Sequence, residues 1–462
     1  MEINEILIVA MFASFILLLF SGFPIAWVLG GVGTLFAALA YMSDMYLDTM
    51  IGIDFNSIGL VVSRIYKIMD NWILVALPMF IFMGNMLDKS GAAENLMQSF
   101  QELFGRVRGG LAITVILIGI ILAASTGIVG ASVVLLGVMS LPAMLKQGYC
   151  KTVAVGTVAS AGTLGILIPP SIMLVIMADQ LALSVGDLFM GAVVPGLLLG
   201  VLYIVYVLGW GIIRPHSMPL AEDVQPVTWR VWVNVMRSVL PTLLMIIAVL
   251  GSIFTGIATP TEASAVGAAA AILLAWHNDR LSINVVRECL HNTFSVSGYI
   301  FAIFIGATMF ALVLRELGGD EYIESFLTSL PFGPYGIILF VLGIVFLLGF
   351  VLDWIEITLI VLPLVAPVIN ALEISINGYG VIDQPIMVWF VMLVAVTLQT
   401  SFLTPPVGFA LFYLKGVCPP EIKLGTIYRG VIPFIVLQLL GLTLLIMFPS
   451  LVNWFPAMVY GQ

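Results

Sequence analysis

The segment Gly162-Thr163-Leu164-Gly165-Ile166-Leu167-Ile168-Pro169-Pro170-Ser171 has a counterpart in the second half of the chain, Leu398-Gln399-Thr400-Ser401-Phe402-Leu403-Thr404-Pro405-Pro406-Val407-Gly408. Each double proline follows a Leu-Pro pair, Leu141-Pro142 in the first half and Leu362-Pro363 in the second. The Leu-Pro pairs are 221 residues apart and the double prolines are 236 residues apart. The difference of 15 residues matches an insertion over the polar segment 371–385. Two markers in the same order indicate an internal repeat.

The composition places this repeat in a membrane. Of the 462 residues, 61% are hydrophobic and only 9% are charged, with 16 Lys and Arg against 25 Asp and Glu. A soluble domain usually carries about 25% charged residues because its surface faces water. The low charge excludes a cytosolic enzyme, a nucleic-acid binder and a disordered scaffold. We therefore expect a polytopic membrane protein without a nucleic-acid partner.

Apolar stretches long enough to cross a bilayer recur along the whole chain, and we expect about a dozen membrane segments. All of them are expected to be helical, because an isolated strand leaves its backbone groups unpaired in lipid. The first apolar stretch should break at Gly22-Phe23-Pro24, where proline interrupts the helical hydrogen bonds. Residues 44–70 mix charged and apolar side chains, which predicts an interfacial helix.

The two double prolines lie inside uncharged stretches that are too short for two full crossings, which would need about 40 residues. We predict a re-entrant helical hairpin in each stretch, near residues 152–180 and 384–415. The non-helical tip of such a hairpin is tolerated at membrane depth only when protein buries it or it lines a wet cavity. Duplicated broken segments mark the binding sites of secondary transporters built from inverted repeats. The alternative is a pair of proline-kinked structural helices.

Three carboxylates lie within or beside apolar stretches, at Glu262, Asp353 and Glu356. A carboxylate inside a membrane costs a few kcal/mol, so it usually faces a cavity, an ion or a partner. For Asp353 and Glu356 we keep two interpretations, a functional site and a solvated position at the interface. Glu262 follows Thr259-Pro260-Thr261, which favours a helix N-terminal cap.

Small and polar residues gather just before the first broken segment, over residues 125–132. These residues offer oxygen ligands of the kind that a hard monovalent cation prefers. Small residues at a helix crossing are the alternative. The three cysteines have no C-x-x-C spacing, and the sequence contains neither a Walker A motif nor an H-E-x-x-H motif. We therefore expect no ATP, haem or transition-metal cofactor and no enzyme activity.

Several motifs resemble those of a known family. They are the segment 162–171, Leu141-Pro142-Ala143-Met144 with Gly148-Tyr149, Ala258-Thr259-Pro260-Thr261-Glu262-Ala263, and Pro78–Met86 with Ser90-Gly91. Together they resemble the large membrane subunit of the tripartite ATP-independent periplasmic (TRAP) transporters. The resemblance implies sodium-coupled uptake of organic acid anions in a bacterial inner membrane, by an elevator mechanism with a scaffold and a transport domain. It also implies a periplasmic substrate-binding protein and a small four-helix membrane subunit as partners.

The resemblance also implies the site residues. The expected Na⁺ ligands are oxygen-bearing or glycine positions beside the two tips, with one carboxylate from the second half: Ser125, Thr126, Gly127, Ser132, Gly162, Thr163, Asp353, Thr400, Ser401, Thr404 and Gly408. The expected substrate contacts lie at the tips: Gly165, Pro169, Pro170, Ser171, Pro405 and Pro406. Ile128-Val129 replaces hydroxyl-bearing residues that many members have, which leaves only backbone carbonyls as ligands there. Residues 42–71 and the segment 124–130 also resemble the branch associated with 2-oxo acids, lactate-like monocarboxylates or mannitol.

This interpretation divides the chain into five parts. We expect N-terminal scaffold helices over 1–108, a first repeat core over 109–213, a hydrophilic loop over 214–237, scaffold helices over 238–333 and a second repeat core over 334–462. The alternatives are a carrier or channel that works without a binding protein, or a membrane assembly protein that transports nothing.

Overall fold

A computed structural model describes residues 3–126, 129–220 and 228–461, except for the side chains of residues 55 and 123–126. Within these residues every regular element is a helix. Nine described helices are long and apolar enough to cross a membrane, and three shorter apolar helices accompany them at Ile3–Leu19, Gly110–Leu122 and Pro334–Leu348. The chain is therefore an all-α polytopic membrane protein, as its composition predicted.

The chain forms two compact units, each built from two separate stretches of sequence. Unit 1 comprises Met1–Leu74 and Ser295–Ile374, and unit 2 comprises Val75–Phe294 and Ser375–Gln462. The expected second repeat core over 334–462 is thus divided, because residues 334–374 belong to unit 1. The non-helical segment between Ala371 and Pro385 carries the chain from one unit to the other. This segment coincides with the insertion inferred from the repeat spacing.

Unit 1 is built around a long helix from the second stretch, α13 (Ile283–Glu316), whose residues from Ser295 onwards belong to this unit. Its other helices are α1 (Ile3–Leu19), α2 (Ile25–Leu47), α3 (Phe55–Met69), α14 (Gly319–Ser329), α15 (Pro334–Leu348), α16 (Trp354–Glu356), the π-helix η4 (Ile357–Val361) and α17 (Leu362–Ala371), with most of the short η1 (Trp72–Val75). A Cβ added at Gly306 would lie 2.3 Å from the carbonyl oxygen of Ala26. Glycine therefore allows α2 and α13 to pack with their backbones in close approach.

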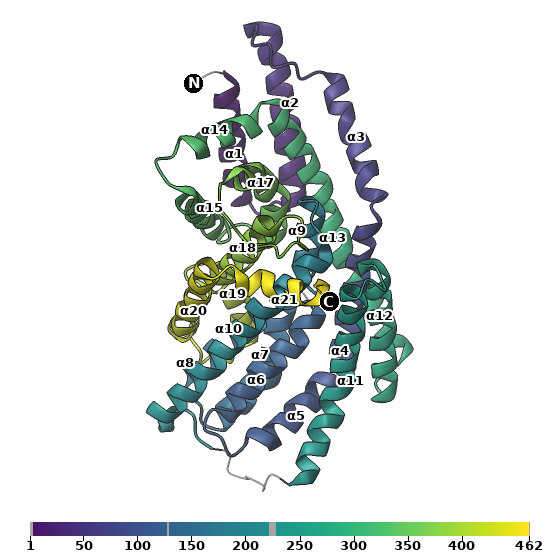
Figure 1. Cartoon of the computed structure of the whole chain (residues 1–462), viewed down its shortest axis with the longest axis vertical. Helices are drawn as coiled ribbons and strands as arrows, with labels where there is room; N and C mark the ends of the chain where they lie inside the picture. The colour runs from purple at the N-terminus through teal and green to yellow at the C-terminus, as the bar shows by residue number, and fades with distance from the viewer. Residues whose placement is uncertain (1–2, 127–128, 221–227, 462) are drawn as a thin grey trace. The chain divides into compact units, whose positions relative to one another are not determined.

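Unit 2 contains both broken segments. Its N-terminal helices are α4 (Ala76–Lys89), α5 (Ala92–Phe104), α6 (Gly110–Thr126), α7 (Val129–Lys146), α8 (Lys151–Thr163), η2 (Leu164–Ile166), α9 (Ile172–Gln180), α10 (Val185–Ile213), η3 (Pro215–Ser217), α11 (Trp229–Phe254) and α12 (Pro260–His277). Its C-terminal helices are α18 (Pro385–Leu403), α19 (Phe409–Val417), α20 (Leu424–Met447) and α21 (Ser450–Tyr460). In Figure 1, α6, α7, α8 and α10 lie side by side, and α8 packs extensively on α6, α7 and α20.

Small residues determine how closely α8 packs. A Cβ added at Gly156 would lie 2.1 Å from the carbonyl oxygen of Gly430 in α20. On another side of α8, a Cβ at Gly119 of α6 would lie 2.9 Å from the Cβ of Ala161. Helices in a membrane associate through such close backbone approaches because lipid provides no hydrophobic driving force between them. Helix α8 is therefore held in place from two sides, and this positions its C-terminal end.

The helix ends confirm one local prediction and show a helix inside a second predicted segment. Helix α1 ends at Leu19 and α2 begins at Ile25, with Gly22 at a φ of 82° and Pro24 as the N-terminal cap of α2. The predicted break at 22–24 is therefore present. The mixed segment 44–70 contains α3, which begins after Asp54 because that side chain accepts a hydrogen bond from the Ser57 N–H at 2.8 Å.

Candidate functional site

The first broken segment has the predicted form of helix, break and helix. Helix α8 ends at Thr163, a single 3₁₀ turn follows over η2, and α9 begins at Ile172. We call Leu164–Ser171 the first tip; its Pro169–Pro170 bond is cis. The Ser171 hydroxyl donates to the carbonyl oxygen of Ile166 at 2.6 Å, which closes the tip on itself. Every residue of the first tip is buried.

The second broken segment repeats this form with a different environment. Helix α18 ends at Leu403 and α19 begins at Phe409, and we call Thr404–Gly408 the second tip. Its Pro405–Pro406 bond is also cis. A Cβ on Gly408 would lie 2.7 Å from the carbonyl oxygen of Phe402, so the turn needs glycine there. Unlike the first tip, this one is partly open, because Pro406 is exposed and Thr404, Pro405 and Val407 are half-buried.

One hydrogen bond joins the two broken segments. The Gln399 side-chain nitrogen Nε2 donates to the Thr163 hydroxyl oxygen at 3.3 Å. The Thr163 hydroxyl itself donates to the carbonyl oxygen of Ser160 at 2.9 Å. Both side chains are fully buried. The two residues are 236 residues apart, which is the spacing between the two double prolines, so they occupy equivalent positions of the repeat.

The hydroxyls around this contact bond to the backbone of their own helices. Thr400 donates to the carbonyl oxygen of Val396 and Thr404 to that of Thr400, both at 2.7 Å. Such bonds to the preceding turn use up the hydroxyl hydrogen and leave the oxygen lone pairs free to accept. Ser401 is buried between them. The hydroxyl oxygens of Thr400 and Thr404 can therefore still accept.

Helix α7 lies against both broken segments. A Cβ on Gly162 would lie 2.5 Å from Cγ2 of Val133, so α8 and α7 touch at this point. From the second broken segment, the Tyr413 ring lies 2.9 Å from the Cβ position of Gly130. The predicted ligand Ser132 is buried on the same helix. Gly127 and the side chains of Ser125 and Thr126 lie outside the described residues.

Asp353 and Glu356 belong to unit 1, whereas both tips belong to unit 2. Asp353 caps α16, and its carboxylate accepts a hydrogen bond from the Trp354 N–H at 2.8 Å. Glu356 is fully buried, and neither carboxylate oxygen has a hydrogen-bond partner among the described residues. A solvated interfacial position, which the sequence left open, is therefore wrong for Glu356. The π-helix η4 begins directly after it, and such segments are frequent at functional sites.

Glu262 has the structural role that its sequence context favoured. The Thr259 N–H donates to the Glu262 carboxylate at 2.8 Å, and the Thr259 hydroxyl oxygen accepts from the Glu262 N–H at 3.3 Å. This reciprocal pair is a capping box at the N-terminus of α12. The interpretation of Glu262 as a helix cap is confirmed.

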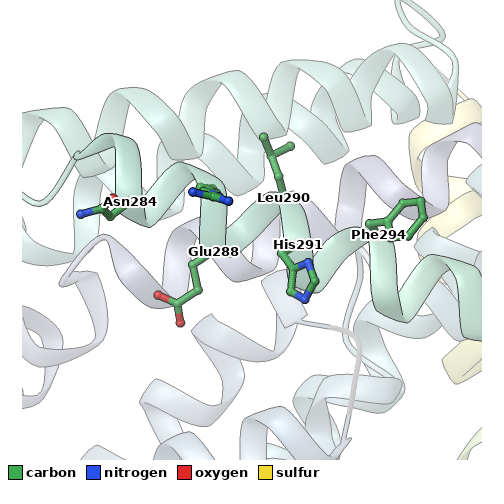
Figure 2. Close-up of a pocket in the computed structure, with 6 residues that line it drawn as sticks. Asn284, Glu288, Leu290, His291 and Phe294 are labelled. Atoms are coloured by element: carbon green, nitrogen blue, oxygen red, sulfur yellow. The ribbon is translucent and has the colours of Figure 1, made fainter.

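A surface pocket of about 640 Å³ has none of the predicted site residues in its lining. All of its lining residues lie on the N-terminal half of α13, as Figure 2 shows for Asn284, Glu288, Leu290, His291 and Phe294. Glu288 forms an ion pair with Lys89 at 2.6 Å, and both side chains are largely exposed. A single exposed helix face of this kind does not enclose a ligand, so the candidate site remains the region of the two tips.

The sequence interpretation missed Gln399. Its position was available from the repeat spacing, which pairs it with Thr163, but an amide opposite a hydroxyl does not stand out as a repeated residue. The structure thus brings together Gly162 and Thr163 with Thr400 and Ser401 in unit 2, through the contact between Thr163 and Gln399. It leaves Asp353 in the other unit.

Comparisons with known proteins agree with this architecture. The C4-dicarboxylate TRAP transporter large permease protein DctM of Pseudomonas aeruginosa is 32% identical over 409 residues, covering 86% of this chain and 90% of its own. The protein of the same name from Vibrio cholerae is 30% identical, covering 95% of each chain. The crystal structure of the Alcanivorax borkumensis YdaH transporter matches the fold with a TM-score of 0.56 at 12% identity, covering 86% of this chain and 90% of that one.

The family-level match extends over nearly the whole chain. The model of the family described as tripartite ATP-independent periplasmic transporter, DctM component, matches residues 12–451. This span includes both broken segments and both Leu-Pro markers of the repeat. The family model and the two relatives confirm the resemblance found in the motifs, and this chain belongs to the DctM component family of the tripartite ATP-independent periplasmic transporters.

Proposed function

We propose that this chain is the ion-translocating and substrate-translocating subunit of a sodium-coupled importer of organic acid anions. It is a large permease of the TRAP family and therefore a secondary transporter. The observation that carries the finer proposal is the pair of duplicated broken segments, whose equivalent residues Thr163 and Gln399 are joined by a hydrogen bond. Oxygen-rich breaks of this kind are where transporters of inverted-repeat design bind ions and anions.

The two tips are proposed to be re-entrant and to form the binding region. Helix breaks expose backbone carbonyls that suit a cation, and helix N-termini such as that of α9 favour an anionic group. The hydroxyls of Thr163, Thr400 and Ser401 supply the oxygen ligands for Na⁺. One Na⁺ moving down a 100 mV membrane potential supplies about 2.3 kcal/mol, so two ions support substantial accumulation of an anion.

The difference in burial between the tips supports an alternating-access cycle. The first tip is buried and the second tip is partly exposed in the same unit. This asymmetry is expected when only one of the two tips is accessible to solvent. We propose that the parts of unit 2 around the tips move as a block, in an elevator-type cycle. The chain would work in the inner membrane of a bacterium.

Family membership supports the proposed partners and substrate class. The large permeases of tripartite transporters work with a small membrane subunit and a periplasmic binding protein. We propose that both are needed here, with a four-helix small subunit, and that the binding protein selects the substrate. The two relatives described above are named for C4-dicarboxylates, which makes a C4-dicarboxylate the first anion to test, with 2-oxo acids next.

The experiment is uptake into proteoliposomes that contain this chain, its small subunit and its binding protein. The substrate is the anion that co-purifies with the binding protein. Uptake should require an inward Na⁺ gradient and should stop when K⁺ or choline replaces Na⁺. Equal uptake in K⁺ would refute sodium coupling, and uptake without the binding protein would refute the tripartite arrangement.

A further inference from the structure

The amide oxygen of Gln399 is buried and has no hydrogen-bond partner among the described residues. An unpaired buried acceptor costs about 1–3 kcal/mol, and nearly all such atoms in native proteins are satisfied. The amide nitrogen of the same side chain is satisfied, because it donates to Thr163. An unpaired oxygen on an otherwise anchored amide indicates a missing ligand.

The contact with Thr163 determines which atom of the Gln399 amide faces away from Thr163. The Thr163 hydroxyl hydrogen is committed to the carbonyl oxygen of Ser160, so toward Gln399 the hydroxyl oxygen acts only as an acceptor. An acceptor requires the NH₂ group of the glutamine opposite it. The Gln399 oxygen must then point away from Thr163.

Nearby donors are also committed. Thr397 donates to the carbonyl oxygen of Leu393 at 2.8 Å, and Thr400 donates to that of Val396 at 2.7 Å. Neither of these flanking threonines can therefore donate to the Gln399 oxygen. A buried oxygen acceptor without a donor attracts a cation. An organic anion would add further acceptors and would be repelled.

We propose that Gln399 is a shared ligand of the two repeats: its amide nitrogen holds Thr163, and its amide oxygen binds a hard monovalent cation. This inference rests on the proposed function, in which Na⁺ is the coupling ion. An amide carbonyl is the same type of ligand as the backbone carbonyls that coordinate Na⁺ at broken transporter helices. Because one side chain contacts both segments, loss of Gln399 should weaken the ion site and the link between the segments together.

The chain offers a matched control for Gln399. Gln438, in α20 of the same unit, is also fully buried, and its amide lies beside the Tyr203 hydroxyl of α10. It lies outside both broken segments. Replacing each glutamine by methionine removes the amide and keeps the length of the side chain. A general effect of deleting a buried amide should appear in both variants, whereas an effect on the ion site should appear only at position 399.

The experiment measures binding of radioactive Na⁺ to the purified full-length chain in complex with its small subunit, by scintillation proximity. Gln399→Met should bind Na⁺ about 10-fold more weakly, as is typical when a metal-site residue or its support is lost. Gln438→Met should keep the wild-type affinity. Gln399→Glu, which retains an oxygen ligand, should bind more tightly than Gln399→Met. Thr163→Val should bind more weakly than wild type, because the amide loses its anchor.

The outcomes separate this inference from the proposed function. Unchanged Na⁺ affinity in Gln399→Met overturns the inference. The partner of the amide oxygen is then a bound water. The proposal of sodium-coupled uptake by the wild type would still stand in that case. Absence of Na⁺ binding in the wild type overturns both. If Gln399→Met does not elute as a folded complex, the Na⁺ affinities of Thr163→Val and Gln399→Glu test the inference in its place. Wild-type Na⁺ affinity in Thr163→Val overturns the inference.

Discussion

Gln399 donates a hydrogen bond to Thr163 across 236 residues of sequence, and the two residues occupy equivalent positions in the two halves of the chain. The contact joins the ends of α8 and α18, the helices that precede the two tips. The proposed ion and substrate region lies around this contact, and most of the predictions below concern it.

The contact between Thr163 and Gln399 should show energetic coupling. Thr163→Val and Gln399→Met each remove one partner, and the double variant removes both. Because each single change leaves its partner unsatisfied, the double variant should be less destabilised than the sum by about 1 kcal/mol. The measurement is the free energy of unfolding in mixed detergent micelles. Strict additivity would show that the two side chains do not interact.

The close packing of α8 on α20 should tolerate no side chain at Gly430. A Cβ there would lie 2.3 Å from the carbonyl oxygen of Thr152, so Gly430→Ala should lower the free energy of unfolding by about 1–3 kcal/mol. Gly425, five residues earlier in α20, has no atom within 4 Å of its Cβ position. Gly425→Ala is the control and should leave stability unchanged or slightly raised. Equal stability of the two variants would argue against this helix crossing.

The two tips should differ in accessibility. In a variant without native cysteines, a hydrophilic maleimide should label Val407→Cys much faster than Ser171→Cys, because Val407 is half-buried and Ser171 is fully buried. Both proteins should show the same melting temperature before their labelling rates are compared. Equal labelling of the two cysteines would contradict the asymmetry on which the alternating-access proposal depends.

The first turn of α3 should depend on pH through Asp54. Hydrogen bonding from the Ser57 N–H lowers the pKa of the Asp54 carboxyl below its ordinary value of 3.8. A depressed pKa in the folded state means that the stabilisation is complete above pH 3.8 and is lost as the pH falls through the folded pKa. Hydrogen exchange at the start of α3 should therefore accelerate in acid. Asp54→Asn should remove this pH dependence. If hydrogen exchange at the start of α3 still accelerates in acid in this variant, a group other than Asp54 causes it.

Much of this architecture could be predicted because its signals are local. The Gly22–Pro24 break and the helix cap at Glu262 each depend on a few neighbouring residues whose backbone chemistry admits few alternatives. The helix breaks at both double prolines follow from the same chemistry. The repeat spacing also located the insertion, which is the non-helical link between Ala371 and Pro385.

What remained unpredicted depends on long-range packing. The burial of Glu356 could not be read from its position at the end of an apolar stretch, because an interfacial and an enclosed carboxylate have the same sequence context. The role of Gln399 required knowing that α8 and α18 meet. The assignment of residues 334–374 to unit 1 likewise depends on contacts with helices from the start of the chain, and periodicity carries no information about them.

The most direct test of the account is the uptake of radioactive Na⁺ driven by substrate. Proteoliposomes containing the chain, its small subunit and its binding protein are loaded without Na⁺, and labelled Na⁺ is supplied outside with and without the substrate. If the two broken segments form a sodium-coupled site, substrate should accelerate Na⁺ entry in the wild type and in Gln438→Met, but not in Gln399→Met. Substrate entry without accompanying Na⁺ in the wild type would contradict the account.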